Sequence, residues 1–284
     1  MCFKPFLMKE IISALAIVAI AFSCSTKTET TDKSVQDSAA STAVVASSSS
    51  PVSAYNPADS GTFKGFIDLI QTEGELPEWA VSFISDETVG RFTSKEAYKE
   101  DSVYLLLYVQ VVPVGPGMDR LQAASFTNDG EIISNIRLGD SYPSSGPGGG
   151  GQDYSYTYDT DRNVIYVTNR TTDWDEDKQE EFTIESWNPY YLADDGQIVH
   201  GRKYPEISQQ YLEASSLDRF SKEELKIMRN EIFAVYGYIF KTEPLKSYYN
   251  ATPWYVPERE NVDDYLSEIE KANVALIKEV EGRK

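Results

Sequence analysis

The stretch FSKEELKIMRNEIFAVYGYIF, residues 220–240, predicts a helix whose two ends are marked by the sequence itself. Ser221 is placed to cap the N-terminus, and Glu224, three residues later, can complete a capping box. The apolar stripe of this helix consists of Leu225, Met228, Ile232 and Val235. Gly237 follows the stripe where helices commonly end with a positive φ, which glycine adopts at little steric cost. We therefore interpret the stretch as a helix that ends in a turn, not as a catalytic site.

The residues after this helix predict further helical elements. A short helix is expected within EPLKSYYN (243–250), with Thr242 as its cap, and the proline-bracketed loop after it should lay Trp254 over the core. A last helix is expected over about 264–280. Asn273 falls within its apolar stripe, so we expect its amide to bond to loop backbone, because an unpaired buried amide costs about 1–3 kcal/mol.

Three separated motifs in this part of the chain resemble one protein family. They are FSKEELKIMRNEIFAVYGYIF, LKSYYNATPWY and LSEIEKANVALIKEVE, in this order, and together they resemble the YARHG domain of bacterial secreted and lipid-anchored proteins. The similarity covers about residues 204–281, under a third of the chain. It implies an extracytoplasmic protein with a small helical domain whose molecular role is unknown.

The run that gives this family its name is altered in the present chain. The family's Tyr-Ala-Arg-His-Gly reads Phe233-Ala234-Val235-Tyr236-Gly237 here. Val235 and Tyr236 therefore stand where the family has Arg and His. If the family used that His for catalysis or metal binding, this protein would lack it. What remains is the chemistry of a helix and its end.

A polar triplet lies earlier in the same helix. It consists of Arg229, Asn230 and Glu231. Two interpretations are open: the three side chains form a contact surface for a partner, or they pair within the domain.

The middle of the chain predicts antiparallel strands. SVYLLLYVQVV (102–112) is the most apolar run and is expected to be a central strand. Hairpin turns are expected at residues 128–130, 159–163 and 194–196. We predict one meandering antiparallel sheet. The fold class is thus α+β, with an antiparallel β-rich domain at 61–203 followed by a small all-α YARHG-like domain at 204–284.

Alternating tyrosines mark one predicted strand of this region. Tyr154, Tyr156 and Tyr158 are separated by Ser155 and Thr157, so the three rings should point to one face of the sheet. If that face is covered, the rings are core, with their hydroxyls reaching the rim. If it is open, the rings form an aromatic platform suited to sugars or to a partner strand.

The N-terminus predicts export and anchoring. Residues 1–23 are expected to be a signal peptide, since the apolar run at 11–22 rises only about 18 Å as a helix and is too short to span a bilayer. The sequence Ala-Phe-Ser-Cys at 21–24 resembles the lipobox of bacterial lipoproteins, which implies lipidation of Cys24. The alternative is a secreted protein with a free thiol at that position.

Residues 24–60 predict a flexible tether. The segment is rich in Ser and Thr and has no apolar periodicity. A flexible chain of this length has a root-mean-square reach of roughly 30–36 Å. It would separate a membrane anchor from a folded head.

Charge and composition exclude several classes of protein. The net charge of −19 disfavours nucleic acid, which is bound first through Lys and Arg. Both cysteines lie within the first 24 residues, and His200 is the single histidine of the chain. Thiolate zinc sites and multi-histidine centres are therefore excluded from the folded part, and we expect no metal and no cofactor.

These observations predict a non-catalytic, lipid-anchored protein of the bacterial cell envelope. Its expected place is the outer membrane, facing the periplasm or the cell surface. Its expected role is a binding or assembly module for an envelope protein or a glycan, and the alternative is a glycan-binding protein that uses the tyrosine face. Enzyme activity would need converging carboxylates, such as two of Asp173, Asp175 and Asp194, and no spacing in the sequence supports that.

Overall fold

The computed structural model describes residues 56–86, 89–115, 117–143, 150–176 and 178–284. The predicted signal peptide, Cys24 and most of the predicted tether lie outside the described residues. Within the described part of the chain, no helix is both long enough and apolar enough to cross a membrane.

The first sheet is antiparallel and has the strand order β1-β2-β3-β4-β5. Its strands are β1 (Gly74–Glu75), β2 (Arg91–Glu100), β3 (Val103–Val112), β4 (Met118–Thr127) and β5 (Ile132–Ser141). The apolar run predicted as a central strand is β3, which pairs with β4 along its whole length and with β2 from Val103 to Val111. The turn between β4 and β5 contains Gly130 with a φ of +91°.

A second antiparallel sheet has the order β6-β7-β8-β9. Its strands are β6 (Gly151–Asp159), β7 (Val164–Asp175), β8 (Glu180–Leu192) and β9 (Ile198–His200). The prediction of one continuous sheet is therefore wrong. The physical reason lies in β3, which is apolar on both faces, so that both faces need a cover. The chain leaves the first sheet after β5, where a single bridge joins Tyr142 to Gln152, and the second sheet covers one of the two faces.

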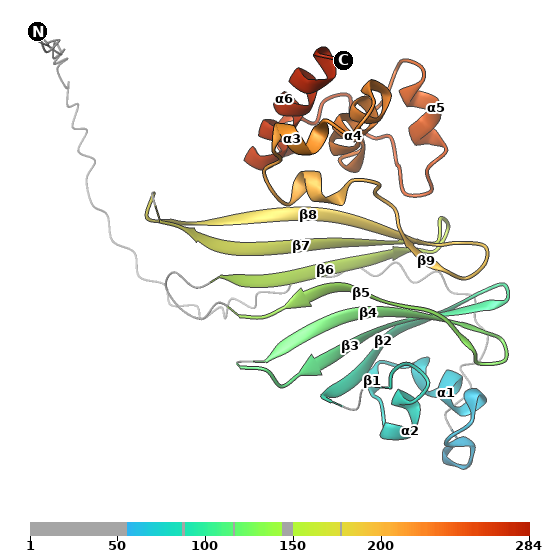
Figure 1. Ribbon diagram of the computed structural model, residues 1–284. Coiled ribbons are helices and arrows are strands. Elements are labelled where there is room, and N and C mark those ends of the chain that lie inside the picture. The colour runs from blue at the N-terminus through green and yellow to red at the C-terminus, as the bar shows by residue number, and fades with distance from the viewer. Residues whose placement is uncertain (1–55, 87–88, 116, 144–149, 177) are drawn as a thin grey trace, which may run out of the picture. The chain divides into compact units, whose positions relative to one another are not determined.

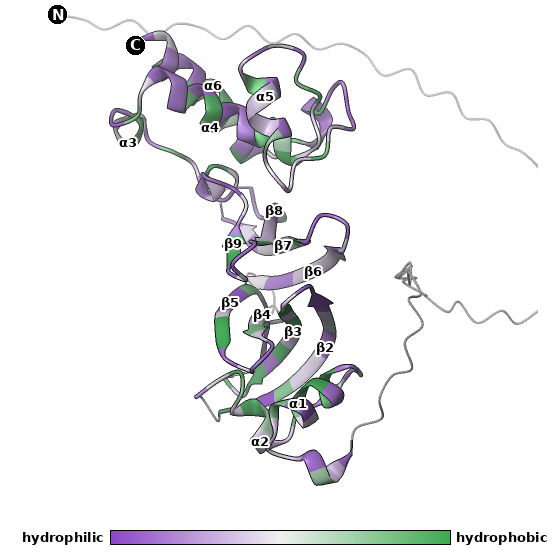
Figure 2. Ribbon diagram, turned by 90° about the vertical axis from the view of Figure 1, so that its right-hand side faces the viewer, coloured by the Kyte–Doolittle hydropathy of each residue, from purple (hydrophilic) through white to green (hydrophobic). Residues whose placement is uncertain are grey.

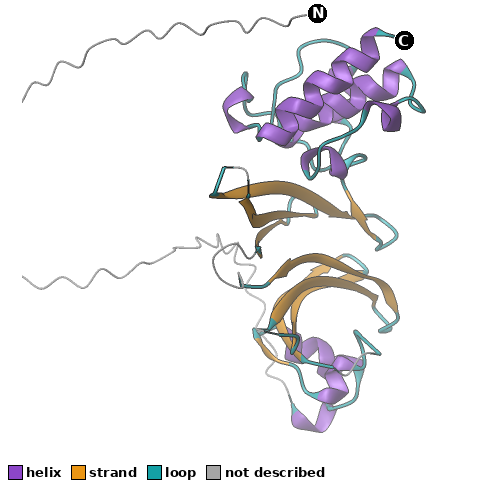
Figure 3. Ribbon diagram, turned by 60° about the vertical axis from the view of Figure 1, so that its left-hand side comes forward, coloured by secondary structure: helices purple, strands orange, loops and turns teal. Residues whose placement is uncertain are grey.

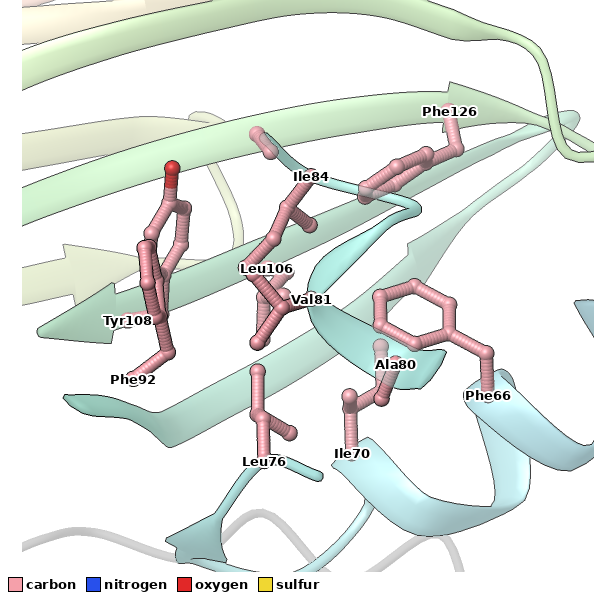
Figure 4. Close-up of a cluster of buried hydrophobic side chains, with 11 residues drawn as sticks. Phe66, Ile70, Leu76, Ala80, Val81, Ile84, Phe92, Leu106, Tyr108 and Phe126 are labelled. Carbon is pink, nitrogen blue, oxygen red and sulfur yellow. The ribbon is translucent and has the colours of Figure 1, made fainter. Parts of the chain in front are cut away.

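The first sheet is covered on its other face by two helices, α1 (Phe63–Ile70) and α2 (Glu78–Val81). Figure 4 shows Phe66 and Ile70 from α1 in the same apolar cluster as Leu106 of β3, with Tyr108 of β3 beside Phe92 at the other end of the cluster. The neighbouring residues Leu105 and Leu107 point the other way, into the cluster between the sheets. Figure 2 shows the hydrophobic colouring of β3 and the hydrophilic colouring of β6.

The C-terminal region is helical. Its helices are α3 (Ala214–Leu217), α4 (Lys222–Val235), α5 (Leu245–Asn250) and α6 (Glu268–Gly282), and short 3-10 turns lie at Pro205–Ser208 and Asp263–Tyr265. A further 3-10 turn, Pro57–Asp59, precedes α1. Ser221 and Glu224 form the capping box of α4. Gly237 has a φ of +74° and its N–H donates to Ala234, while the next N–H, of Tyr238, donates to Phe233. These two bonds are the Schellman arrangement that ends a helix.

Two predicted helix starts are wrong in this region. The last helix begins at Glu268 and not near 264, because Ser267 and Glu270 form a second capping box there. The helix α5 is preceded by Pro244 as its N-cap, without a side-chain cap from Thr242. Asn273 bonds to loop backbone: its amide donates to the carbonyls of Ile207 and Gln210, 2.8 Å from each.

The helical region packs on the outer face of the second sheet, the face turned away from β3 (Figures 1 and 3). The indole N–H of Trp254, which is buried, donates to Gly201 at 2.7 Å. The hydroxyl of Tyr166 on β7 donates to the carbonyl of Trp254 at 3.1 Å. The order of layers is therefore helix, sheet, sheet, helix, and the α+β fold class with a C-terminal helical region is confirmed.

Candidate functional site

The three tyrosines singled out in the sequence lie on β6 and face the first sheet. Tyr154, Tyr156 and Tyr158 are half-buried and pack against the apolar cluster between the sheets. Tyr158 lies against Tyr98 of β2 with ring centroids 4.4 Å apart, and its hydroxyl donates to Asn163 at 3.1 Å. Burial, together with nearby carboxylates, raises the pKa of Tyr154 to about 12. The rings thus belong to the core between the sheets rather than to an open platform.

The polar triplet of α4 pairs within the helical region. Arg229 donates through Nε to Glu281 of α6 at 3.1 Å, and Asn230 donates through Nδ2 to the carbonyl of Lys226 at 2.7 Å. Glu231 is buried. Of the two interpretations of the triplet, these contacts support internal pairing.

Glu231 forms a buried ion pair that joins the helical region to the second sheet. Its Oε1 lies 3.3 Å from Nε of Arg202, and the two side chains are 2% and 0% exposed. The backbone N–H groups of Lys203 and Tyr204 also donate to this carboxylate, at 2.9 and 3.0 Å. Burial raises the pKa of Glu231, while Arg202 and the two N–H groups oppose that rise. Arg202 in turn donates to the carbonyl of Trp187 on β8 at 3.2 Å.

A second buried carboxylate continues this network. The hydroxyl of Tyr236 donates to Glu270 at 2.8 Å, and Ser208 donates to the same carboxylate at 2.6 Å. Ser208 accepts from Arg202 at 2.8 Å, so the two buried carboxylates share one arginine through a serine. Burial, followed by the charge of Glu270, raises the pKa of Tyr236. Tyr236 is therefore held as a neutral hydrogen-bond donor.

A cleft of about 390 Å³ lies between the second sheet and the end of α4. We call it the interdomain cleft. Its sheet wall is formed by Thr157, Asp159, Arg162, Tyr166, Val167, Trp187, Asn188 and Pro189, and its helical wall by Ala234, Val235, Tyr236, Gly237, Trp254, Val256, Glu258, Arg259 and Tyr265. The altered family run thus lines the cleft with four of its five residues.

Aromatic rings dominate the mouth of the interdomain cleft. Tyr236 lies between two exposed aromatic side chains, with its ring centroid 6.3 Å from Trp187 and 6.2 Å from Tyr265. Trp187 is 39% exposed and Tyr265 is 54% exposed. Large exposed rings that flank a concave site are a common basis for ligand binding.

The charged groups of the cleft are paired with one another. Arg162 lies 2.8 Å from Asp159, and Arg259 lies 3.1 Å from Glu258. Arg259 also donates to the carbonyl of Tyr236 at 2.9 Å and stacks over the ring of Tyr265. The cleft therefore offers donors and acceptors in balance, within a chain whose net charge is −19.

The one histidine does not contribute to the cleft lining. Nδ1 of His200 lies 3.1 Å from the carbonyl of Arg202, and its ring packs edge-on against Tyr190. Burial lowers the pKa of His200. Among the residues that the structure describes, no group of three or more His, Cys, Asp or Glu side chains converges to hold a metal ion.

One of three comparisons with known proteins finds a match, and it lies in the C-terminal region. Residues 201–282 match the YARHG domain family, which confirms the resemblance seen in the sequence motifs. The C-terminal part of this chain is a YARHG domain. No curated protein matches the chain, and no solved structure matches it.

Sequence reasoning missed the two exposed aromatic residues of the cleft. Trp187 belongs to β8 and Tyr265 to the turn before α6, and neither segment carries a motif that links it to the other. Tyr236 was identified only as the replacement of the family His. One signal is present in the alternation along β8, which places Trp187 on the same face of the sheet as Pro189. Thr168 of β7 is the cross-strand neighbour of Trp187 on that face.

Proposed function

We propose that this protein is a non-catalytic binding module, anchored by lipid at Cys24 in the bacterial cell envelope, whose ligand lies in the interdomain cleft. One observation carries the proposal: the altered signature run of the YARHG domain forms a wall of this cleft, opposite a sheet wall that carries the exposed ring of Trp187. Concave sites with aromatic walls and a few polar groups are the usual form of small-ligand and chain-ligand sites.

The chemistry of the cleft favours binding over catalysis. Its two acidic side chains, Asp159 and Glu258, are each held in an ion pair with an arginine of the cleft. Tyr236, at the position of the family His, donates a hydrogen bond to Glu270 and has a raised pKa. A phenol in this state is a poor proton shuttle near neutral pH.

The sequence supports the anchoring part of the proposal. The apolar run at 11–22 ends two residues before Cys24, and the Ser/Thr-rich segment at 24–60 separates this cysteine from α1. We place the protein at the outer membrane, on its periplasmic or surface face, with an envelope protein or a glycan as its partner. Nucleic acid is a poor partner for so acidic a chain.

Site-specific photocross-linking in intact bacterial cells tests this function. A photoreactive amino acid replaces Tyr265 at the cleft, and in a control chain it replaces Tyr211, which is 65% exposed and lies outside the cleft lining. We expect adducts from position 265 and few from position 211. Equal adduct formation at both positions, or none at 265, would contradict a ligand in the interdomain cleft.

A further inference from the structure

The interdomain cleft continues along the outer face of the second sheet. A hollow of about 220 Å³ shares Trp187, Tyr236 and Tyr265 with the cleft and reaches Thr183. A third, more open hollow of about 590 Å³ shares Thr183 and extends to Gly151 at the start of β6. We call the three hollows together the sheet groove. The length of β6 from Asp159 to Gly151 is about 26 Å, so the groove is long enough for a chain-like ligand of several repeating units.

The floor of the sheet groove is rich in hydroxyl groups. Thr157 lies in the cleft, and Thr172 and Thr183 lie in the open hollow, where their hydroxyls are 3.2 Å apart. Hydroxyl groups both donate and accept, so this floor suits a ligand whose own groups do the same.

The arginines that line the sheet groove are paired with carboxylates. Arg170 lies 2.5 Å from Glu185, in the same manner as the pairs of Arg162 and Arg259 in the cleft. Two further carboxylates, Asp153 and Glu181, line the open hollow. An anionic ligand would therefore find each of these arginines already paired with a carboxylate, and it would be repelled by the two further carboxylates. The charge of the groove favours an uncharged ligand.

The position of the groove argues against a peptide. Extended peptides bind by adding a strand to an open sheet edge, where backbone groups are free. The sheet groove lies on a face, over β6, β7 and β8, and the backbone groups of the central strand β7 pair with strands on both sides. In the described part of the chain, the outer side of β6 carries one bridge, from Gln152 to Tyr142, and β8 pairs with β9 from Tyr190 to Leu192. A helical peptide would need a continuous apolar floor, whereas this floor carries threonines and ion pairs.

We propose that the sheet groove binds a neutral, unbranched glycan chain. The inference rests on the proposed function and names the ligand class for the same site. The apolar faces of sugar rings stack on Trp187 and Tyr265, which are exposed and lie in the shared part of the groove. The sugar hydroxyls exchange hydrogen bonds with the threonines and with the outward atoms of the ion pairs. This face is the opposite one to the face that carries Tyr154, Tyr156 and Tyr158.

The test uses the full chain on an array of immobilised oligosaccharides of defined structure, neutral and acidic, from two to eight units. We expect binding to neutral unbranched chains, with an affinity that rises with chain length. Trp187→Ala should lower the affinity roughly tenfold or more, since one stacking ring and its burial are lost. Tyr265→Ala, on a different element, should lower it by a similar factor.

Phe182→Ala is the matched control. Phe182 lies on the same strand with nearly the same exposure, 38% against 39%, but its side chain belongs to the opposite face of the sheet. Its variant should bind as the parent does, and thermal melts of all variants exclude loss of fold.

Three outcomes would overturn the inference. They are the absence of binding to every neutral chain, a preference for acidic chains, and equal affinity of Trp187→Ala and Phe182→Ala. If cross-links from Tyr265 persist while no neutral glycan binds, the proposed function stands and this ligand class falls. If both experiments are negative, both proposals fall.

Discussion

Tyr236 donates a hydrogen bond of 2.8 Å to the buried carboxylate of Glu270 and so ties the end of α4 to the beginning of α6. The same carboxylate caps α6 by accepting from the backbone N–H of Ser267 at 2.9 Å. The position that holds His in the YARHG signature is thus used here to satisfy a buried acid. Tyr236 also presents its ring to the interdomain cleft, so one residue serves both the scaffold and the proposed binding surface.

The first prediction separates these two roles of Tyr236. Tyr236→Phe removes the hydroxyl and keeps the ring. We expect the free energy of unfolding to fall by about 1–3 kcal/mol, because a buried carboxylate loses a donor, with little change in ligand affinity. Urea unfolding measures the first quantity, and Tyr265→Phe, at an exposed ring, serves as the control. Unchanged stability of Tyr236→Phe would show that the bond to Glu270 contributes nothing.

The second prediction concerns the ion pair between Arg202 and Glu231. Arg202→Met leaves a buried carboxylate without its cation, and we expect a loss of about 3–5 kcal/mol of unfolding free energy. The double variant with Glu231→Gln should lose less than the sum of the two single losses, because the uncompensated charge is gone. A double-mutant cycle by chemical denaturation measures this coupling. Strict additivity would contradict it.

For Arg202→Met we also predict how the loss of unfolding free energy changes with pH. Burial raises the pKa of Glu231 above its unfolded value, and removal of Arg202 should raise it further. A carboxyl group with a raised folded pKa supports the fold below its unfolded pKa of 4.5, and this support is lost as pH rises through the folded pKa. The destabilisation by Arg202→Met should therefore be smaller at about pH 5 than at about pH 8. The opposite order would mean that Glu231 is not the group left unpaired.

Local features of the fold could be predicted from the sequence because their causes are local. A capping box needs two residues three positions apart, and the pair at Ser221 and Glu224 was read directly. The same signal is present at Ser267 and Glu270, although the apolar stripe alone predicts a start near 264. Hairpin turns likewise depend on a few adjacent residues.

The division into two sheets and the position of the cleft depend on contacts between distant segments. The double-sided burial of β3 requires a cover on each face, yet periodicity alone does not say whether a helix or a second sheet supplies it. Trp187 and Tyr265 meet around Tyr236 only because the helical region docks on β7 and β8. That docking is fixed by Arg202 and Trp254, whose partners lie far away in the chain.

The third prediction tests the anchor. Cys24→Ala should release the protein from the membrane fraction or leave the signal peptide uncleaved, because the lipid would be attached to the thiol of Cys24. Cys2→Ala is the matched control, because Cys2 lies before the apolar run and should have no such role. Membrane fractionation and intact mass measurement read the result. An unmodified thiol at position 24 of the purified native protein would exclude lipidation.

The last prediction concerns Gly237, where two independent constraints act. Its φ of +74° disfavours any residue with a side chain, and a Cβ built there would lie 2.8 Å from the carbonyl oxygen of Val256. The first constraint costs about 1–2 kcal/mol for most residues and less for Asn, which tolerates the left-handed conformation. The second acts on every side chain alike, because the clashing atom belongs to the backbone.

Gly237→Val should therefore destabilise the YARHG domain most, and Gly237→Asn should destabilise it less but still measurably. The matched control is Gly282→Ala in α6, where a Cβ meets no atom within 4 Å and φ is not positive. Alanine there should be neutral or slightly stabilising, since it favours the helical conformation over glycine by up to about 1 kcal/mol. Thermal melts of the three variants rank these effects. A Gly237→Asn protein as stable as the parent would show that Val256 moves away at no cost, and that only the backbone conformation selects glycine at this helix end.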